Sequence, residues 1–383
     1  MKILWHSAAP WEPTGYGTQT AIWTTWLAKQ GHDVTLSART GLMYAIGDHG
    51  GLPVLPTAPF IGETVMDELL IGHVNAVQPD LVIILFDMWS FGLPPDRLPQ
   101  VPVACWMPVD CSPPDQMDRQ YLASGRIYPV AMSEFGKRQI ESLGYTCGYV
   151  PHGIHTTKWN ALPSLKAQIR EGFGIPQDAF VIGINAASTD PERKGLWEQM
   201  EAFSIFHKRH PEAILSMHTL FGFAHGFNAA AAAIDLGIPA GALRYPGAYE
   251  LMRGALTGDH MQNWYNALDV LSNVSMGEGF GLAALEAQAC GIPVILGDNS
   301  TGPQLAGPGW LVKGQTHWNA RHSAKWHVPF TREIVKAYEA AYKSARHKRQ
   351  QAWQFVQQYD VERVGPRWEP VLAAATGTCE ERL

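Results

Sequence analysis

The chain has 383 residues, of which 46% are hydrophobic and 17% are charged, and its formal net charge is −6. This balance is typical of a globular chain of about two domains and excludes intrinsic disorder. The acidic charge argues against a dedicated nucleic-acid-binding protein, and no apolar run is long enough to predict a transmembrane helix.

The number of cysteines and the first ten residues indicate in which cellular compartment the protein is expected. Five cysteines are an odd number, and none of them forms a CxxC pair, so neither a disulfide framework nor a zinc site is predicted. The opening residues, MKILWHSAAP, show no signal-peptide pattern. We therefore expect a cytoplasmic protein with reduced thiols.

In the first part of the chain, short apolar runs alternate with helical patterns. Strands are predicted over residues 2–8, 33–38, 80–86, 101–107, 127–133 and 146–152, and helices over 18–30 and 134–143. Apolar strands separated by helices are typical of parallel sheets buried on both faces. The pattern predicts a doubly wound, Rossmann-like α/β domain over residues 1–160, with ligands bound at the carboxyl ends of its strands.

The same alternation starts again near residue 178, after a Pro- and Gly-containing linker over residues 159–176. Strands are predicted over 179–186, 213–219, 242–247, 270–275, 293–297 and 309–314, and helices over 196–209, 260–268, 282–290 and 331–358. These elements predict a second Rossmann-like domain over residues 175–358. The closing helix, within residues 360–383, is expected to pack back on the first domain, and the two domains are expected to face a cleft.

The segment GEGFGLAALEAQACG, residues 277–291, places two carboxylates among glycines and small apolar residues. Residues 282–290 are strong helix formers, and Gly279 and Gly281 just before them let the backbone turn sharply and approach a ligand closely. The first amides of this helix, about Phe280 to Leu282, have no intrahelical partner and carry the positive end of the helix dipole, which suits a phosphate.

A diphosphate at this helix start would lie between the two glutamates. Glu278 stands in the loop before the helix and Glu286 one turn into it, and a carboxylate can accept hydrogen bonds from two neighbouring hydroxyls. The two charges would then bracket a nucleotide-sugar, with Glu286 on the ribose and Glu278 on the sugar. Spacing alone leaves another interpretation open, in which one glutamate complements the helix dipole and the other is a paired core residue.

The sequence EGFGLAALE, followed by AQACGIPVI, resembles the E-x7-E signature of the retaining glycosyltransferases of the GT-B fold, group-1 (GT4-type) family. The preceding WYNALDVLSNVSMG resembles the helix and strand that lead into that motif. The resemblance covers about residues 180–315 and, more weakly, 1–155. It implies a nucleotide-diphosphate-sugar donor and sugar transfer to an acceptor hydroxyl with retention of configuration. The donor-binding residues that it implies in this segment are Gly279, Phe280, Gly281, Leu282 and Glu286, with Glu278 in the catalytic set.

A basic pair stands in the segment NAASTDPERKGLWEQMEAF, residues 185–203, directly before a predicted helix. Two cations there would neutralise a diphosphate leaving group as the glycosidic bond breaks. In the resembled family a basic pair has that role, which makes Arg193 and Lys194 catalytic candidates and Asn185 a donor-binding candidate. Ile184 stands about where the family often has its arginine, so Arg193 is the less direct match. A solvated pair of loop charges is the alternative.

Three loops of the first domain supply further candidates. PTGYGTQT, residues 13–20, allows close backbone approach where the first helix begins. VDCSPP places a carboxylate just beyond a buried strand, and VPHGI ends the domain. In the resembled family these positions line the donor and acceptor sites. Asp110 joins the catalytic set, and the donor-binding candidates are Gly15, Tyr16, Gly17, His152 and Gly153. The alternatives are a glycine turn at residues 13–20, a turn-forming role for Asp110 and a structural role for His152.

No Asp-x-Asp occurs in the chain and no group of histidines has metal-ligand spacing, so we expect no metal and no cofactor. The donor is a substrate; the acceptor stays open among glycans, lipids, small molecules and proteins, and no nucleic-acid partner is expected. The basic run KSARHKR, residues 343–349, leaves peripheral membrane contact open beside a solvated helix face. The sequence thus predicts a metal-independent glycosyltransferase, with a sugar-nucleotide epimerase of the same fold and a non-catalytic nucleotide-sugar-binding module as alternatives.

Overall fold

The computed structural model describes residues 1–57, 63–187, 192–222, 226–256 and 258–380. It divides into two compact units, which are described separately. Unit 1 comprises Met1–Gly153, Asn319–Ala324 and Val361–Leu383, and unit 2 comprises Ile154–Trp318 and Lys325–Asp360. Among the described residues, no helix is both long enough and apolar enough to cross a membrane.

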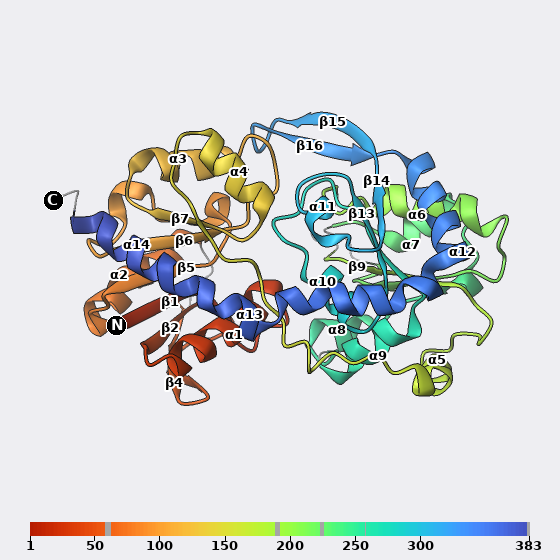
Figure 1. The fold of residues 1–383 in the computed structure, drawn as a ribbon, viewed down its shortest axis with the longest axis horizontal. Coiled ribbons are helices and arrows are strands. Elements are labelled where there is room, and N and C mark those ends of the chain that lie inside the picture. The colour runs from red at the N-terminus through yellow and green to blue at the C-terminus, as the bar shows by residue number, and fades with distance from the viewer. Residues whose placement is uncertain (58–62, 188–191, 223–225, 257, 381–383) are drawn as a thin grey trace. The chain divides into compact units, whose positions relative to one another are not determined.

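Unit 1 is built on an eight-stranded sheet in the order β3-β4-β2-β1-β5-β6-β7-β8 (Figure 1). Its strands are β1 (Lys2–Ala8), β2 (Asp33–Thr40), β3 (Gly47–His49), β4 (Leu52–Leu55), β5 (Leu81–Ile84), β6 (Val103–Met107), β7 (Tyr128–Ala131) and β8 (Gly148–Tyr149). Its helices are α1 (Gly15–Lys29), α2 (Glu63–Val77), α3 (Gln116–Ser124), α4 (Glu134–Ser142), α13 (Val361–Val364) and α14 (Trp368–Glu380). Neighbouring strands pair in parallel, except that β3 and β4 are antiparallel.

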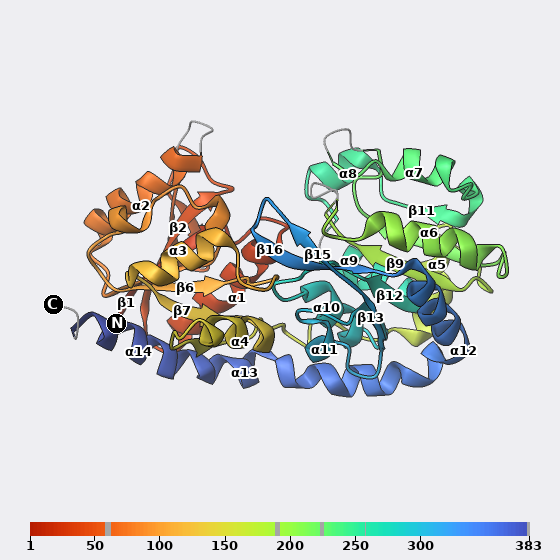
Figure 2. The same cartoon turned by 90° about the horizontal axis from the view of Figure 1, so that it is seen from above.

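Helices cover both faces of this sheet, as the two views of the ribbon show (Figures 1 and 2). Helices α2 and α3 pack on one face. On the other face the ring of Trp368, from α14, lies 5.6 Å from Trp5 on β1, 6.1 Å from Trp23 on α1 and 5.1 Å from Trp106 on β6. All four indoles are fully buried. The last helix of the chain is therefore part of the core of unit 1.

We expect Trp368→Ala to lower the stability of the protein by about 3–5 kcal/mol, because it removes a large buried ring and leaves a cavity. The midpoint of urea unfolding measures this. Trp353→Ala, at a tryptophan that is 45% exposed, is the matched control and should change stability by no more than about 0.5 kcal/mol. Equal midpoints for Trp368→Ala and wild type would contradict the assignment of α14 to this core.

Unit 2 contains a six-stranded, all-parallel sheet in the order β11-β10-β9-β12-β13-β14. Its strands are β9 (Val181–Asn185), β10 (Ile214–His218), β11 (Leu243–Arg244), β12 (Val270–Asn273), β13 (Val294–Gly297) and β14 (Trp310–Val312). Its helices are α5 (Lys166–Gly172), α6 (Leu196–His207), α7 (Ala229–Asp235), α8 (Ala248–Met252), α9 (Asp259–Ala267), α10 (Leu282–Ala289), α11 (Gly302–Leu305) and α12 (Thr331–Val356). Because β9, β12 and β13 are neighbours and run in the same direction, the loops that follow them begin side by side.

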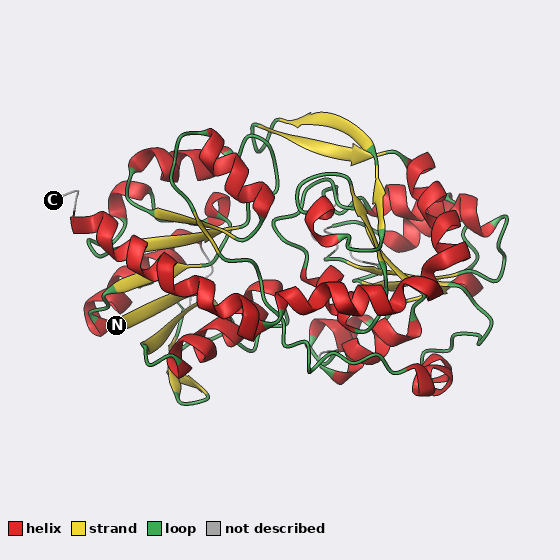
Figure 3. Ribbon diagram, viewed as in Figure 1, coloured by secondary structure: helices red, strands yellow, loops and turns green. Residues whose placement is uncertain are grey.

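The predicted fold class, two α/β domains with parallel sheets, is confirmed, and several elements differ from the sequence prediction (Figure 3). The predicted linker contains helix α5, and α2 and α3 were not predicted. A two-stranded sheet of β15 (Gly314–Asn319) and β16 (Ala324–Pro329) was also missed. Most residues of β15 are exposed, so this strand lacks the buried apolar run by which the other strands were recognised.

Candidate functional site

The helix that follows the first glutamate begins at the residue that the sequence predicts, Leu282. Helix α10 starts at Leu282, and Gly281 precedes it with φ +110° and no side-chain cap. A backbone in this region favours glycine, which has no Cβ to clash. The N–H groups of Leu282 and Ala283 cannot bond within the helix. Leu282, the last residue of the expected range 280–282, thus has an amide without an intrahelical partner.

Glu278 lies beside the basic pair. The Nζ of Lys194 donates to Glu278 Oε2 at 2.6 Å, and the hydroxyl of Ser275 donates to the same oxygen at 3.2 Å. Arg193 Nη1 lies 3.9 Å from that oxygen and donates to the carbonyl oxygen of Gly277 at 3.1 Å. The Glu278 side chain is 27% exposed. The structure therefore brings three of the four predicted catalytic residues into one charged cluster.

The protonation of Glu278 is set by two opposed effects. Burial raises the pKa of its carboxyl, but the charges of Lys194 and Arg193 and the hydrogen bonds from Lys194 and Ser275 outweigh this, so that the pKa lies below its ordinary value. Glu278 is therefore ionised at neutral pH, although it is largely removed from water.

Close backbone packing brings the basic pair to this glutamate. Gly195, at the start of α6, has φ +56°, and a Cβ there would overlap the carbonyl oxygen of Val274. The N–H of Met276 donates to the carbonyl oxygen of Arg193 at 2.7 Å. The loop after β9 and the loop after β12 are thus locked together, as expected for loops that follow neighbouring parallel strands.

Glu286 lies one turn into α10 and accepts a hydrogen bond of 2.7 Å from the hydroxyl of Tyr265. The side-chain amide of Asn185 donates to that hydroxyl at 2.9 Å. Asn185 in turn exchanges two hydrogen bonds with Asn273, at 3.1 and 2.9 Å. A chain of polar side chains therefore links Glu286 to the carboxyl ends of β9 and β12. Tyr265 and Asn273 were not predicted as site residues, although both lie in the segment whose resemblance was noted.

We expect Glu286→Gln to stabilise the protein at neutral pH, because burial raises the pKa of Glu286 above its ordinary value of 4.5. A raised pKa means that ionisation opposes folding, so this penalty is absent below about pH 4.5 and grows as the pH rises through the folded-state pKa. The amide oxygen of glutamine can still accept from Tyr265. The melting temperature of the variant should therefore exceed that of wild type at pH 7, and the two values should converge near pH 4. A gain in melting temperature over wild type that is smaller at pH 7 than at pH 4 would contradict this.

A second loop, residues 298–301 between β13 and α11, lies against the loop that carries Glu278. The two loops line a pocket that opens to solvent, and its lining includes Ser275, Glu278, Gly281, Asn299 and Ser300. This second loop was not predicted as part of the site, because nothing in the residues GDNSTG indicates a contact with a segment about twenty positions earlier.

The candidates of the first domain lie in unit 1. Gly15, Tyr16 and Gly17 form the first turn of α1, and the hydroxyl of Tyr16 donates to Asp87 Oδ2 at 2.7 Å. Asp110 follows β6. Gly153 is packed so tightly that a Cβ would lie 2.7 Å from the Trp23 ring.

His152 and Asp110 have local partners in unit 1. The His152 ring is buried, 4.8 Å from that of Trp106. Asp110 lies beside Cys111, where burial first and Asp110 second raise the pKa of the thiol. The contacts described for His152 and Gly153 are those of packed structural residues, and their predicted role in donor binding stays a prediction.

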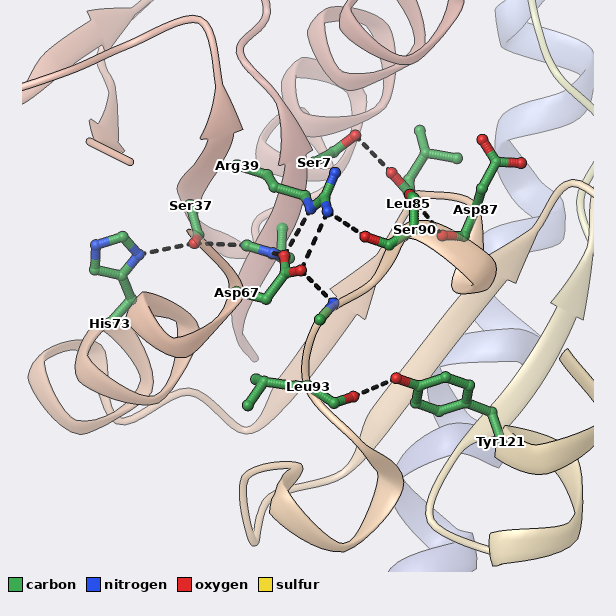
Figure 4. Close-up of polar contacts among 12 residues, drawn as sticks. Ser7, Ser37, Arg39, Asp67, His73, Leu85, Asp87, Ser90, Leu93 and Tyr121 are labelled. Carbon is green, nitrogen blue, oxygen red and sulfur yellow. Dashed lines mark hydrogen bonds and ion pairs between the residues drawn. The ribbon is translucent and has the colours of Figure 1, made fainter. Parts of the chain in front are cut away.

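A buried ion pair fixes the segment that carries Asp87 (Figure 4). Arg39 on β2 donates to both carboxylate oxygens of Asp67 on α2, at 2.6 and 3.2 Å, and also to the carbonyl oxygen of Ser90. The N–H of Gly92 donates to Asp67 at 2.5 Å. Burial raises the pKa of Asp67, but its hydrogen bonds and Arg39 lower it overall. Strand β2, helix α2 and residues 87–92 are thereby joined, and no sequence pattern indicated this network.

Within the described part of the chain, no three His, Cys, Asp or Glu side chains are grouped so that they could hold a metal ion. The four cysteines whose side chains are described are buried free thiols. Metal independence stays a prediction.

Residues 243–321, which include the Glu278 loop and α10, match the family model described as glycosyl transferases group 1. Over this segment the chain is therefore similar to the group 1 glycosyltransferases. It is 32% identical over 136 residues to a D-inositol 3-phosphate glycosyltransferase of Paenarthrobacter aurescens, an alignment that covers 35% of this chain and 31% of that protein. It is 54% identical over 43 residues to one of Streptomyces bingchenggensis, covering 11% and 10%. The chain thus aligns with about a third or less of the length of these curated relatives.

Solved structures match this chain over nearly its whole length. The sucrose-phosphate synthase of Thermosynechococcus elongatus superposes with a TM-score of 0.74 at 14% identity, covering 98% of this chain and 100% of that one. Anabaena Alr3699/HepE superposes with a TM-score of 0.71 at 15% identity and the same coverage in its complex with UDP and glucose; it was also solved with UDP-glucose. At these identities the likeness establishes the GT-B fold of the chain and no more.

Proposed function

We propose that this protein transfers a sugar from a nucleotide-diphosphate-sugar donor to an acceptor hydroxyl. The observation that carries the proposal is the arrangement of Glu286, the unpaired amides of the first turn of α10 and the Lys194–Glu278 ion pair. An anion is favoured at a helix N-terminus, and Lys194, bonded to Glu278 in the loop before that helix, adds a full positive charge. The UDP-glucose complex of the Anabaena neighbour supports a donor of this class.

In the ligand-free protein, the ammonium group of Lys194 forms an ion pair with the carboxylate of Glu278. A diphosphate carries more negative charge than one carboxylate, so donor binding should turn Lys194 and Arg193 toward the diphosphate. Glu278 is then available to accept hydrogen bonds from the hydroxyls of the sugar, while Glu286 accepts them from the ribose. Each glutamate thus binds one end of the donor.

In the transfer step, the bond between the anomeric carbon and the diphosphate breaks, and its electron pair stays on the diphosphate. The acceptor hydroxyl oxygen bonds to the anomeric carbon, and its proton passes to the departing diphosphate. Negative charge grows on the diphosphate as the bond breaks, so Lys194 interacts more strongly with the transition state than with the bound donor. The proposal includes retention of configuration, an orienting role for Asp110, independence from metal ions and a cytoplasmic location.

The first test is a panel of nucleotide-sugars, measured for thermal stabilisation of the protein and for release of the nucleoside diphosphate in the presence of EDTA. At least one donor should raise the melting temperature and be turned over. An isomerised donor without sugar transfer or hydrolysis would indicate an epimerase instead. Tight binding of a donor without any turnover would indicate a binding module.

We expect Lys194→Ala to lower kcat by about 10²–10³-fold, because it removes a charge that stabilises the leaving group. The donor Kd should change much less, since the amides of α10 and Glu286 remain. Lys208→Ala, at an exposed lysine just after the end of α6, is the charge-matched control and should keep wild-type kcat. Wild-type turnover in Lys194→Ala would contradict the proposed role.

A further inference from the structure

The loop of residues 298–301 holds the glutamate loop through three consecutive side chains. Asn299 donates to the carbonyl oxygens of Ser275 and Met276, at 3.2 and 2.7 Å. The hydroxyl of Thr301 donates to the carbonyl oxygen of Phe280 at 2.6 Å. Between these two, the hydroxyl oxygen of Ser300 accepts the backbone N–H of Glu278 at 3.1 Å. Of the three, Ser300 contacts the backbone of the catalytic candidate itself.

Two glycines allow this loop to fold so tightly. A Cβ on Gly302 would overlap the carbonyl oxygen of Gly297. A Cβ on Gly297 would lie 2.6 Å from Asn299 Oδ1 and 3.0 Å from the carbonyl oxygen of Ser275. The loop therefore turns back on itself directly beside residues 275–280.

Ser300 adopts a backbone conformation that is unfavourable for serine. Its φ is +40°, in the left-handed region that glycine adopts without strain. A serine held there lowers the stability of the fold unless its side chain contributes something that glycine lacks. What the side chain contributes here is the acceptor for the N–H of Glu278.

Resting on the function proposed above, we propose that Ser300 is a positioning residue that aims the Glu278 carboxylate at the transferred sugar. Donor binding draws Lys194 away from Glu278 and so removes the shortest contact of that carboxylate. The backbone contact with Ser300 does not involve Lys194 and persists in the donor complex. It then fixes the backbone from which the Glu278 side chain extends toward the sugar while the sugar is bound.

The decisive variant is Ser300→Gly, which relieves the backbone strain and removes the hydroxyl. We expect an unchanged or higher melting temperature, a Kd for the sugar-free nucleoside diphosphate within twofold of wild type, and a kcat for donor turnover at least tenfold lower. Ser300→Asn tolerates the left-handed region and restores a side-chain oxygen acceptor, so it should recover part of the lost kcat.

Ser323→Gly is the matched control, because Ser323 also has a positive φ, of +48°, but bonds to Gln116. It should keep wild-type kcat. In a Glu278→Gln background, Ser300→Gly should cause no further loss, since the residue it positions is already disabled.

Wild-type kcat in Ser300→Gly, or the same tenfold loss on top of Glu278→Gln, would overturn the positioning role. Failure of the proposed function would look different: wild type would turn over no donor, or Glu278→Gln would be as active as wild type.

Discussion

A cation within hydrogen-bond distance allows Glu278 to remain ionised where burial opposes its charge. The surrounding structure serves to make this contact. Neighbouring parallel strands β9 and β12 start their loops side by side, and Gly195 lets these loops touch through their backbones. Without that approach Lys194 would lie in a solvated loop, and a buried, unpaired carboxylate would take up a proton.

The pKa values of the two glutamates, Glu286 in α10 and Glu278 in the loop before it, are shifted in opposite directions. The pKa of Glu278 is lowered because two cations face it, whereas the pKa of Glu286 is raised because burial is offset only in part by Tyr265. Glu278 thus contributes stability above its ordinary pKa, and Glu286 opposes stability over the same range. A residue that lowers stability in the ligand-free protein is the kind of residue that function retains.

Regular patterns in the sequence explain what could be predicted. Buried parallel strands are continuous apolar runs, so both sheets were recognised, and the glycines before residue 282 indicated a helix start that approaches a ligand. The predicted roles of Lys194 and Glu286 rest on the charge and spacing of these residues together with the family resemblance, and the structure shows their neighbours. Helix α5 was missed because a segment with Pro and Gly reads as a linker.

Contacts between distant residues could not be predicted in this way. Ser300 lies 22 positions from Glu278, and Tyr265 lies 80 positions from Asn185. Neither pair belongs to a periodic pattern, and each meets only because the strands between them are ordered in the sheet as they are. The Arg39–Asp67 pair of unit 1 arises in the same way, from β2 and α2.

The central claim is that a diphosphate binds the amides at the start of α10. The sequence contains five Gly–Leu peptide bonds, at Leu42, Leu52, Leu93, Leu196 and Leu282. Labelling glycine carbonyls with 13C and leucine amides with 15N therefore selects five amide signals in an NMR spectrum. On saturation with the nucleoside diphosphate that stabilises the protein most, the Leu282 signal should shift furthest, while Leu42, Leu52 and Leu93 of unit 1 serve as references. An unmoved Leu282 signal at saturation would contradict the account.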